Sequence, residues 1–346
     1  MSETVFTVVA TTAKIAFIWG FVLTIVPILV WAERRVAGLI QDRPGPNRVG
    51  PMGLLQPIAD MVKLFVKEDV SPTFSDKLLH VLAPLILFFP ALTAAAVIPF
   101  GSSLPVTVGG KVVQVPLVVA DVNIGLLLFL AVGSLGVYSI VLAGWSSNNK
   151  FSLLGGIRSS AQMISYELAM SFAAVSVFLQ AGSLRPSDIV RWQAENVWIA
   201  VPQVVGCVIF VVAAFAEANR LPFDLPEAEA ELVSGYHTEY SSFRFGMFFM
   251  AEYMNMTAAA AFISTLYFGG WSLPFLKLTG VVGALVSVAV FLAKTGFFLF
   301  FFLWVRWTLP RFRYDQLMDL GWKVLFPLSL LNLLGTAAWV AFAGGK

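Results

Sequence analysis

Eight long apolar segments constrain the fold of this chain more than any other feature of its sequence. A helix that crosses the hydrocarbon core of a bilayer needs about 20 mainly apolar residues. The segments that reach this length are 10–31, 78–98, 122–143, 161–180, 197–217, 245–268, 281–304 and 324–343. Only 12% of the 346 residues are charged, against roughly 25% in a soluble domain. The sequence therefore predicts an all-α polytopic membrane protein, a single membrane domain over residues 1–346 with eight transmembrane helices.

The basic residues of the loops predict the orientation of these helices. Lysine and arginine are enriched in the cytoplasmic loops of membrane proteins. The first, third, fifth and seventh loops hold most of them, and the largest group lies within residues 32–77. Both termini are therefore expected on the periplasmic side. The long first loop and the extended termini favour a bacterial inner membrane over a mitochondrial one.

Two loops have recognisable local structure. Residues 53–68 carry apolar side chains at helical spacing, which predicts a short amphipathic helix on the cytoplasmic side. This helix could lie at the membrane surface or pack on its own protein. In residues 105–116, β-branched runs flank Gly109 and Gly110, which predicts a short external β-hairpin.

Few residues are suited to holding a metal or a prosthetic group. Cys207 is the only cysteine, so a disulfide framework and an iron–sulfur cluster bound by cysteines are excluded. The two histidines, His80 and His237, are far apart in the sequence. We therefore expect no metal site in this chain, and no nucleic-acid partner.

Four ionisable residues stand out within the apolar segments, namely Glu167, Glu217, Glu252 and Lys294. A charge at the centre of a membrane helix costs about 2.5–3.5 kcal/mol on insertion scales, so such residues suggest a function. Buried carboxyl groups can exchange protons near neutral pH. The alternative is that each one pairs with a base or a backbone group and only fixes helix packing.

An acidic stretch, EANRLPFDLPEAEAE at residues 217–231, extends this row of carboxylates. Pro222 and Pro226 prevent a continuous helix, so we expect irregular backbone over 219–226. A solvated acidic loop is one explanation of such a charge run. The apolar residues between the acids favour partial burial instead, and closely spaced acids that are buried could store protons or respond to a nearby charge.

Several long motifs, in the same order along the chain, carry a family resemblance. They are ERRVAGLIQDRPGPNRVGPMGLLQPIADMVKLFVKED (33–69), RSSAQMISYE (158–167), EANRLPFDLPEAEAELVSGYHTEY (217–240), FFMAEYMNM (248–256) and RFRYDQLMDLGWK (311–323). Over about residues 15–330 the chain resembles the H subunit of the proton-pumping NADH–quinone oxidoreductase, respiratory complex I.

The resemblance implies roles for two groups of residues. The first would line the tunnel that admits quinone or contact the hydrophilic arm: Glu33, Arg34, Arg43, Asp60, Lys63, Phe223, Arg306, Arg311 and Arg313. The second would form a carboxylate path that couples quinone reduction to proton translocation: Glu167, Glu217, Asp224, Glu227, Glu229 and Glu231, with Glu239 and Glu252 nearby. No complete catalytic site is expected in this chain.

The same resemblance implies the cofactors and the partners. The substrate of the complex would be a quinone, and this chain would bind no redox cofactor. NADH, FMN and iron–sulfur clusters would belong to partner subunits. The partners would be the hydrophilic quinone-site subunits, neighbouring subunits of the membrane arm, and membrane lipid.

Two alternatives stay open at this point. One is the homologous subunit of a membrane-bound hydrogenase or of another donor–quinone reductase. The other, more remote, is a stand-alone cation or proton transporter, suggested by the intramembrane acids. The lack of an internal repeat argues against the transporter, as do the long basic loops.

Overall fold

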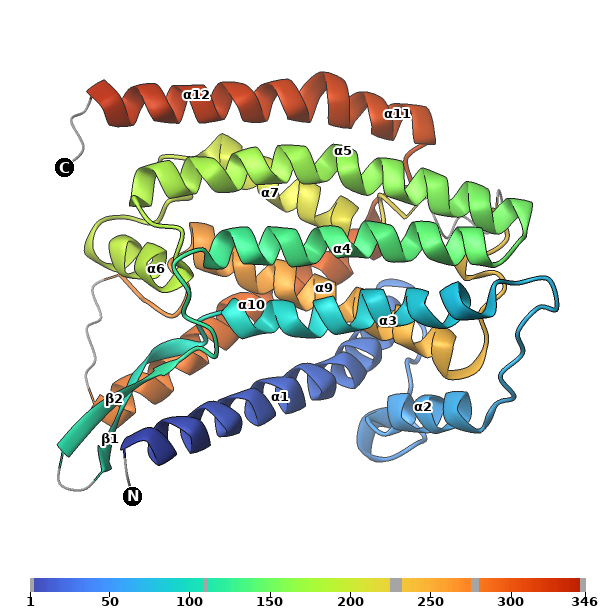
Figure 1. Cartoon of the computed structure of the whole chain (residues 1–346), viewed down its shortest axis with the longest axis horizontal. Helices are drawn as coiled ribbons and strands as arrows, with labels where there is room; N and C mark the ends of the chain where they lie inside the picture. The colour runs from blue at the N-terminus through green and yellow to red at the C-terminus, as the bar shows by residue number, and fades with distance from the viewer. Residues whose placement is uncertain (1–2, 109–110, 225–231, 275–279, 343–346) are drawn as a thin grey trace.

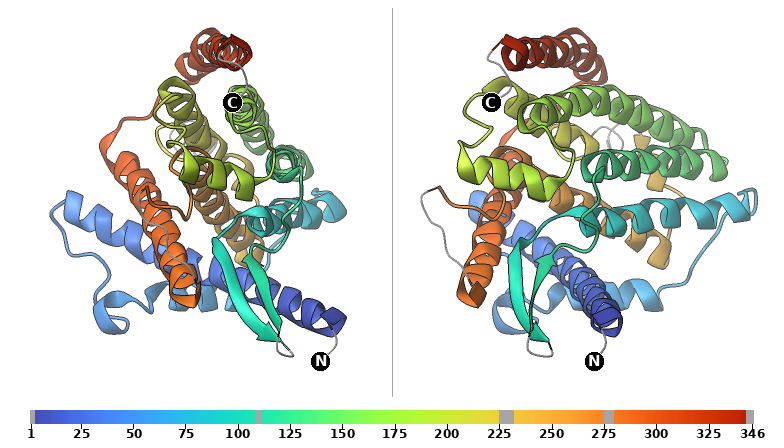
Figure 2. Two further views of the ribbon diagram at one scale, coloured as in Figure 1. Left: turned by 90° about the vertical axis from the view of Figure 1, so that its left-hand side faces the viewer. Right: turned by 60° about the vertical axis from the view of Figure 1, so that its left-hand side comes forward.

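The structure is a computed structural model that describes residues 3–108, 111–224, 232–274 and 280–342. Its long helices run roughly side by side between two ends of the molecule (Figure 1). One end carries the N-terminus, the β-hairpin and the short helix α6, and the other carries α2 and the turn between α4 and α5 (Figures 1 and 2).

The described helices and strands follow one another along the chain in this order: α1 (Glu3–Ile40), α2 (Gln56–Val66), α3 (Lys77–Ala94), β1 (Gly101–Val108), β2 (Lys111–Leu117), α4 (Gly125–Ser146), α5 (Lys150–Ala181), α6 (Pro186–Glu195), α7 (Val204–Glu217), α9 (Ser242–Tyr267), α10 (Gly280–Thr308), α11 (Tyr314–Asp319) and α12 (Phe326–Phe342). A π-helical stretch, Leu320–Leu325, joins α11 to α12.

Six of the described helices are long and apolar enough to cross a membrane: α1, α3, α4, α5, α10 and the run from α11 to α12. The apolar helix α7 is shorter, with 14 residues. Helix α9 has 26 residues and is polar at several positions. The mainly helical membrane fold is therefore established, and six spans are supported by length and composition.

Several helices begin before or after the apolar segments predicted as spans, each for a local reason. Helix α5 begins at Lys150 rather than 161, because the side chain of Asn149 caps it by accepting from the Phe151 N–H at 2.9 Å. The last long helix begins at Tyr314 rather than 324. The fifth begins at Val204 rather than 197, since residues 199–203 around Pro202 form turns. The apolar residues of a helix show which part of it crosses the hydrocarbon layer. The helix itself can continue beyond that part for as long as its backbone N–H and C=O groups are hydrogen-bonded.

The predicted pair of strands is present as a two-stranded antiparallel sheet in which Leu104 pairs with Val115 and Thr107 with Val112. This hairpin packs on α10. The Ser102 N–H donates to Ser287 Oγ at 2.9 Å, and the rings of Phe100 and Phe291 meet edge to face with centroids 5.5 Å apart. Leu104 and Leu117 of the hairpin also line a cavity between α1 and α10.

Helix α9 lies in the middle of the bundle. Its second half is buried from Met256 to Tyr267, and the alanines at 258–261 let neighbouring helices approach closely. Tyr267 donates to the Ala173 carbonyl of α5 at 3.2 Å. Helices α1, α3, α7 and α10 all pack against α9, so the side chains of α9 lie among those of four other helices.

Candidate functional site

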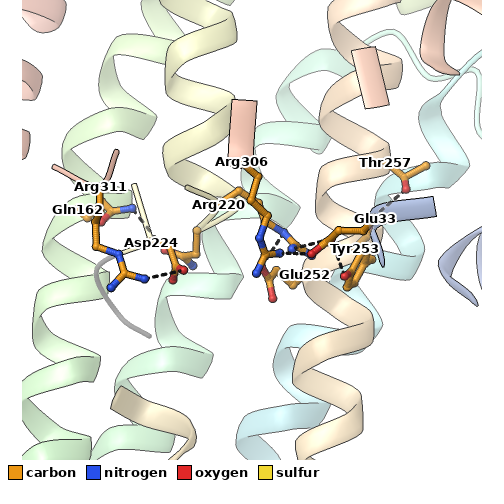
Figure 3. Close-up of polar contacts among 10 residues, drawn as sticks. Glu33, Gln162, Arg220, Asp224, Glu252, Tyr253, Thr257, Arg306 and Arg311 are labelled. Atoms are coloured by element: carbon orange, nitrogen blue, oxygen red, sulfur yellow. Dashed lines mark hydrogen bonds and ion pairs between the residues drawn. The ribbon is translucent and has the colours of Figure 1, made fainter. Parts of the chain in front are cut away.

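A buried ionic cluster lies where α1, α9, α10 and the segment after α7 meet (Figure 3). The Arg220 guanidinium contacts Glu252 (Nε to Oε1, 2.7 Å) and Glu33 (Nη1 to Oε2, 3.2 Å). Arg306 reaches the other oxygen of Glu33 at 2.8 Å. The Tyr253 hydroxyl donates to Glu33 Oε2 at 2.7 Å, and Arg220 lies 4.1 Å from the Tyr253 ring centroid.

The cluster balances two arginines with two glutamates. The Arg220 side chain is 3% exposed and the Glu33 side chain 9%, so these charges are shielded from water. Removing one partner of a buried ion pair costs about 3–5 kcal/mol, since it leaves an uncompensated charge. The family resemblance assigned Glu33 and Arg306 to the tunnel and Glu252 to the carboxylate path, and Arg220 belonged to neither predicted group.

The irregular backbone after α7 is held against α5 by Gln162. Its amide Nε2 donates to the carbonyls of Ala216 at 2.9 Å and Phe223 at 2.8 Å. The predicted break in the helix is confirmed here, because α7 ends at Glu217. Asp224 follows, and it pairs with Arg311 at 3.3 Å. Figure 3 shows this second ion pair beside the larger cluster.

Phe223 is buried within a small group of aromatic side chains. Its ring meets Tyr166 edge to face at 5.3 Å and Phe312 at 5.6 Å. The Tyr166 hydroxyl donates to the Leu317 carbonyl at 2.9 Å. These contacts connect the segment after α7 to the start of the last long helix.

Glu217 faces a small cavity between α3, α4, α7 and α9. The cavity has about 20 Å³ of free space, with Asn255 also in its wall, which is room for about one water. On α4, Gly133 leaves space for the carboxylate: a Cβ added there would lie 2.8 Å from Glu217 Oε1. The charge of Glu167 on α5 acts on Glu217, so two of the predicted carboxylates interact.

A larger cavity of about 290 Å³ opens between α1, α2 and α9. Its apolar wall includes Val30, Met61 and Phe249. At one side Arg34 pairs with Asp60 at 2.7 Å, and Lys63 is also in the wall. The structure thus brings three residues of the predicted tunnel group to one mainly apolar cavity.

Comparisons with known proteins place the sequence in one family. A family model described as NADH dehydrogenase matches residues 13–337. The NADH-quinone oxidoreductase H subunit of Salinibacter ruber is 52% identical over 330 residues, which cover 92% of each chain. An H subunit of the same enzyme from Geobacter metallireducens is 53% identical over 328 residues, 95% of each chain. The corresponding subunit 8 of Rhodothermus marinus is 52% identical over 344 residues, 95% of this chain and 97% of the relative.

The chain belongs to the H-subunit family of NADH–quinone oxidoreductase. Members of this family are membrane subunits of an oxidoreductase complex. The names of these relatives favour NADH–quinone oxidoreductase over the alternative of a membrane-bound hydrogenase. The stand-alone transporter receives no support from them.

The remaining predicted residues of this H-subunit family member lie apart from the cluster and the cavity. Arg43 is exposed and donates to Gln41, and Arg313 pairs with Asp315 on the surface at 3.0 Å. Glu239 accepts from the Asn149 amide at 2.6 Å. The predicted residues Glu227, Glu229 and Glu231 lie outside the described residues.

Lys294, the one base among the four intramembrane charges, fixes helix packing in this family member. Its Nζ donates to the carbonyls of Phe268 at 2.7 Å, Gly270 at 3.0 Å and Ser272 at 2.6 Å. These carbonyls follow the last residue of α9, where a cation also complements the helix dipole. For Lys294 the packing explanation is the one that the contacts support.

The segment before α9 is packed as a neutral aromatic group. Tyr240 stacks on His80 with ring centroids 4.0 Å apart, and His237 contacts Phe248 at 5.3 Å. Burial lowers the pKa of His237 to about 3 and raises the pKa of Tyr240 to about 12. Both side chains are therefore uncharged at neutral pH. Across the described ranges, no group of His, Cys, Asp and Glu could hold a metal ion.

Proposed function

We propose that this chain admits quinone to an NADH–quinone oxidoreductase and that its buried carboxylates couple quinone reduction to proton translocation. The family membership supports the complex. The observation that carries the mechanism is the position of the α1–α2–α9 cavity beside the buried ionic cluster.

The cavity suits the apolar tail of a quinone. Val26, Val30 and Phe249 offer an apolar wall, and burying a methylene gains about 0.8 kcal/mol. On the face of α2 away from the cavity, Val62 and Val66 are more than half exposed, as expected for a helix lying on a membrane surface. A quinone could therefore enter from the lipid between α1 and α2.

Helix α1 links the cavity to the cluster, because Arg34 borders the cavity and the adjacent Glu33 belongs to the cluster. In a medium of low dielectric constant, a change in one charge has a large electrostatic effect on other charges nearby. Reduction of a quinone nearby would thus shift the balance between Glu33, Arg220 and Glu252. Arg220 follows Glu217 by three residues and precedes Asp224 by four. A movement of the segment that holds Arg220 would therefore act on the Glu167–Glu217 pair on one side and on Asp224 on the other.

The topology follows from the same proposal. Counting α7 and α9 as spans gives eight, with both termini on the periplasmic side of a bacterial inner membrane. The cavity, α2 and the exposed Arg43 and Arg313 then lie at the cytoplasmic end, where hydrophilic partner subunits would dock. The chain would bind no redox cofactor, and NADH, FMN and iron–sulfur clusters would belong to those partners.

A matched pair of substitutions on α2 tests the tunnel. Met61 lines the cavity, whereas the adjacent Val62 is 56% exposed. Met61→Trp should lower kcat/KM for a long-tailed quinone about tenfold, since overpacking typically costs 1–3 kcal/mol, and should affect a tail-less quinone less. Val62→Trp is the control. Equal slowing of both quinones, or equal effects of both variants, would refute the entrance.

Cysteine labelling tests the orientation. Cys207 is the only cysteine, so Cys207→Ser provides a background for Lys150→Cys and Asn196→Cys. Lys150 begins α5, at the end of the bundle that carries the turn between α4 and α5, and Asn196 follows α6 at the other end (Figure 1). An impermeant maleimide should label Asn196→Cys in right-side-out vesicles and Lys150→Cys in inverted ones. The reverse pattern would overturn the proposed topology, and labelling in detergent controls for sites that partners cover.

A further inference from the structure

A second apolar groove lies along the N-terminal part of α1, before the residues of that helix that line the proposed quinone entrance. Its outer compartment, about 240 Å³, lies between α1, α10 and the hairpin. Its inner compartment, about 180 Å³, lies between α1, α3, α9 and α10. Both have Phe21, Phe100 and Leu292 in their walls. The two compartments therefore adjoin in one groove along α1 from Lys14 to Ile25, about 16 Å by the helical rise, and the rings of Phe21 and Phe100, which meet edge to face at 6.0 Å, lie between them.

The walls of this groove suit a hydrocarbon chain. Among the described residues that line the outer compartment, Lys14 is the only one with a polar side chain. The described wall of the inner compartment carries two hydroxyls, Thr257 and Thr295, and no charge. Thr257 donates to the Tyr253 carbonyl of its own helix at 2.8 Å. Such a surface binds an apolar chain well and gains nothing from a polar solute.

Lys14 places a positive charge at the outer mouth of the groove. Its Nζ donates to the Val118 carbonyl at 2.9 Å and, more weakly, to that of Pro116 at 3.5 Å. An ammonium group has three donors, so one is left for an outside acceptor. Asp121, whose charge acts on Lys14, is itself held by the Ser187 hydroxyl at 2.8 Å.

We propose that this groove binds an acyl chain of an anionic phospholipid, with the lipid phosphate at Lys14. The charge at the mouth and the apolar walls behind it match the two parts of such a lipid. A basic residue at the membrane surface attracts anionic lipid by about 1 kcal/mol. In the proposed orientation, this lipid belongs to the outer leaflet.

A quinone is the competing occupant. Thr295 Oγ1 is buried and has no hydrogen-bond partner among the described residues, so it could donate to a quinone carbonyl. A quinone, however, has no anionic group for Lys14. The test must therefore compare the two molecules directly.

Two glycines offer a matched pair of variants. A Cβ added at Gly296, which lines the inner compartment, would meet no atom within 4 Å, and the same holds at Gly20 of α1, outside both walls. Gly296→Leu should place its side chain in the inner compartment, because its Cβ has open space there. Gly20→Leu adds the same side chain outside it.

The experiment uses the whole complex reconstituted with a phosphatidylglycerol that carries a diazirine on one acyl chain, or with the matched phosphatidylcholine. After photolysis, peptide mass spectrometry should find label within 14–25 and 284–299. We expect about fivefold more label from phosphatidylglycerol, loss of that preference in Lys14→Gln, and loss of the label in Gly296→Leu but not in Gly20→Leu.

Three results would overturn the proposal. One is undiminished label in Gly296→Leu, and another is an unchanged lipid preference in Lys14→Gln. The third is preferential labelling of the same segments by a photoreactive quinone. Because the readout is the position of the label, the outcome does not depend on quinone reduction through the α1–α2–α9 cavity.

Discussion

Arg220 is the residue on which the buried cluster depends, because its guanidinium contacts both Glu33 and Glu252. Glu33 lies 187 residues before Arg220 in the sequence, and Glu252 lies on a later helix. No local pattern therefore pairs these residues. The one available signal was that Arg220 is the only base in the acidic stretch 217–231. The individual carboxylates Glu167, Glu217 and Glu252 were predictable, because a charge in an apolar segment is conspicuous.

Gly133 provides the most specific prediction at the residue scale. In Gly133→Ala the new Cβ would lie 2.8 Å from Glu217 Oε1, so the carboxylate must move. We expect proton pumping per NADH oxidised to fall about as much as in Glu217→Gln, with normal assembly. Pumping is measured by dye quenching in vesicles, and assembly on native gels.

Gly136→Ala is the control for this prediction. It lies one turn further along α4, where a Cβ would meet only the flexible ends of Leu87 at 3.2 Å and Met163 at 3.5 Å. If Gly133→Ala pumped like Gly136→Ala, the position of the Glu217 carboxylate would not matter for coupling.

At the scale of elements, the apolar pattern of the sequence predicts where the long helices lie, whereas tertiary contacts determine where they begin and end. The apolar segments located the long helices, but α1 extends over 38 residues, about 57 Å, well beyond its apolar part. The short helix α6 was not predicted, since its ten residues are largely polar. Helix α9 ends where Lys294 of α10 binds three carbonyls, a contact that no local pattern encodes.

Lys294→Met should destabilise the junction of α9 and α10 without changing quinone kinetics. Three charge-assisted hydrogen bonds are lost and their carbonyls are left buried, so we expect a loss of about 3 kcal/mol or more. The measurement is the temperature of half-inactivation of the complex, together with the KM for quinone at 25 °C.

Lys323→Met provides the comparison, because its ion pair with Asp319 is 2.7 Å long but its side chain is 71% exposed. Such surface pairs contribute less than about 1 kcal/mol. Equal inactivation temperatures for the two variants would refute the structural role of Lys294, and a change in KM would suggest a functional one.

At the scale of the whole molecule, the buried aromatic segment before α9 makes stability depend on pH. The pKa of His237 is about 3 in the folded chain and about 6.5 in an unfolded one. As the pH falls below 6.5, the unfolded state binds a proton that the folded state does not, so stability decreases, by up to about 1.4 kcal/mol per pH unit.

His237→Gln should remove this contribution. We expect the parent to lose more thermal stability than the variant between pH 7 and pH 5, as followed by heat inactivation of the complex at each pH. Parallel curves for the two proteins would show that His237 does not titrate on unfolding.

The sequence by itself determined the membrane class, the approximate place of the long helices, the family and the set of ionisable residues available for coupling. These follow from local requirements: a backbone in lipid must be paired within a helix, and a family motif is contiguous. Only the tertiary structure decided which charges meet, namely that Glu33, Arg220, Glu252 and Arg306 share one buried cluster and that Lys294 binds backbone. The physical reason is that ion pairs and cavities depend on helix packing between residues far apart in the chain, which no local pattern specifies.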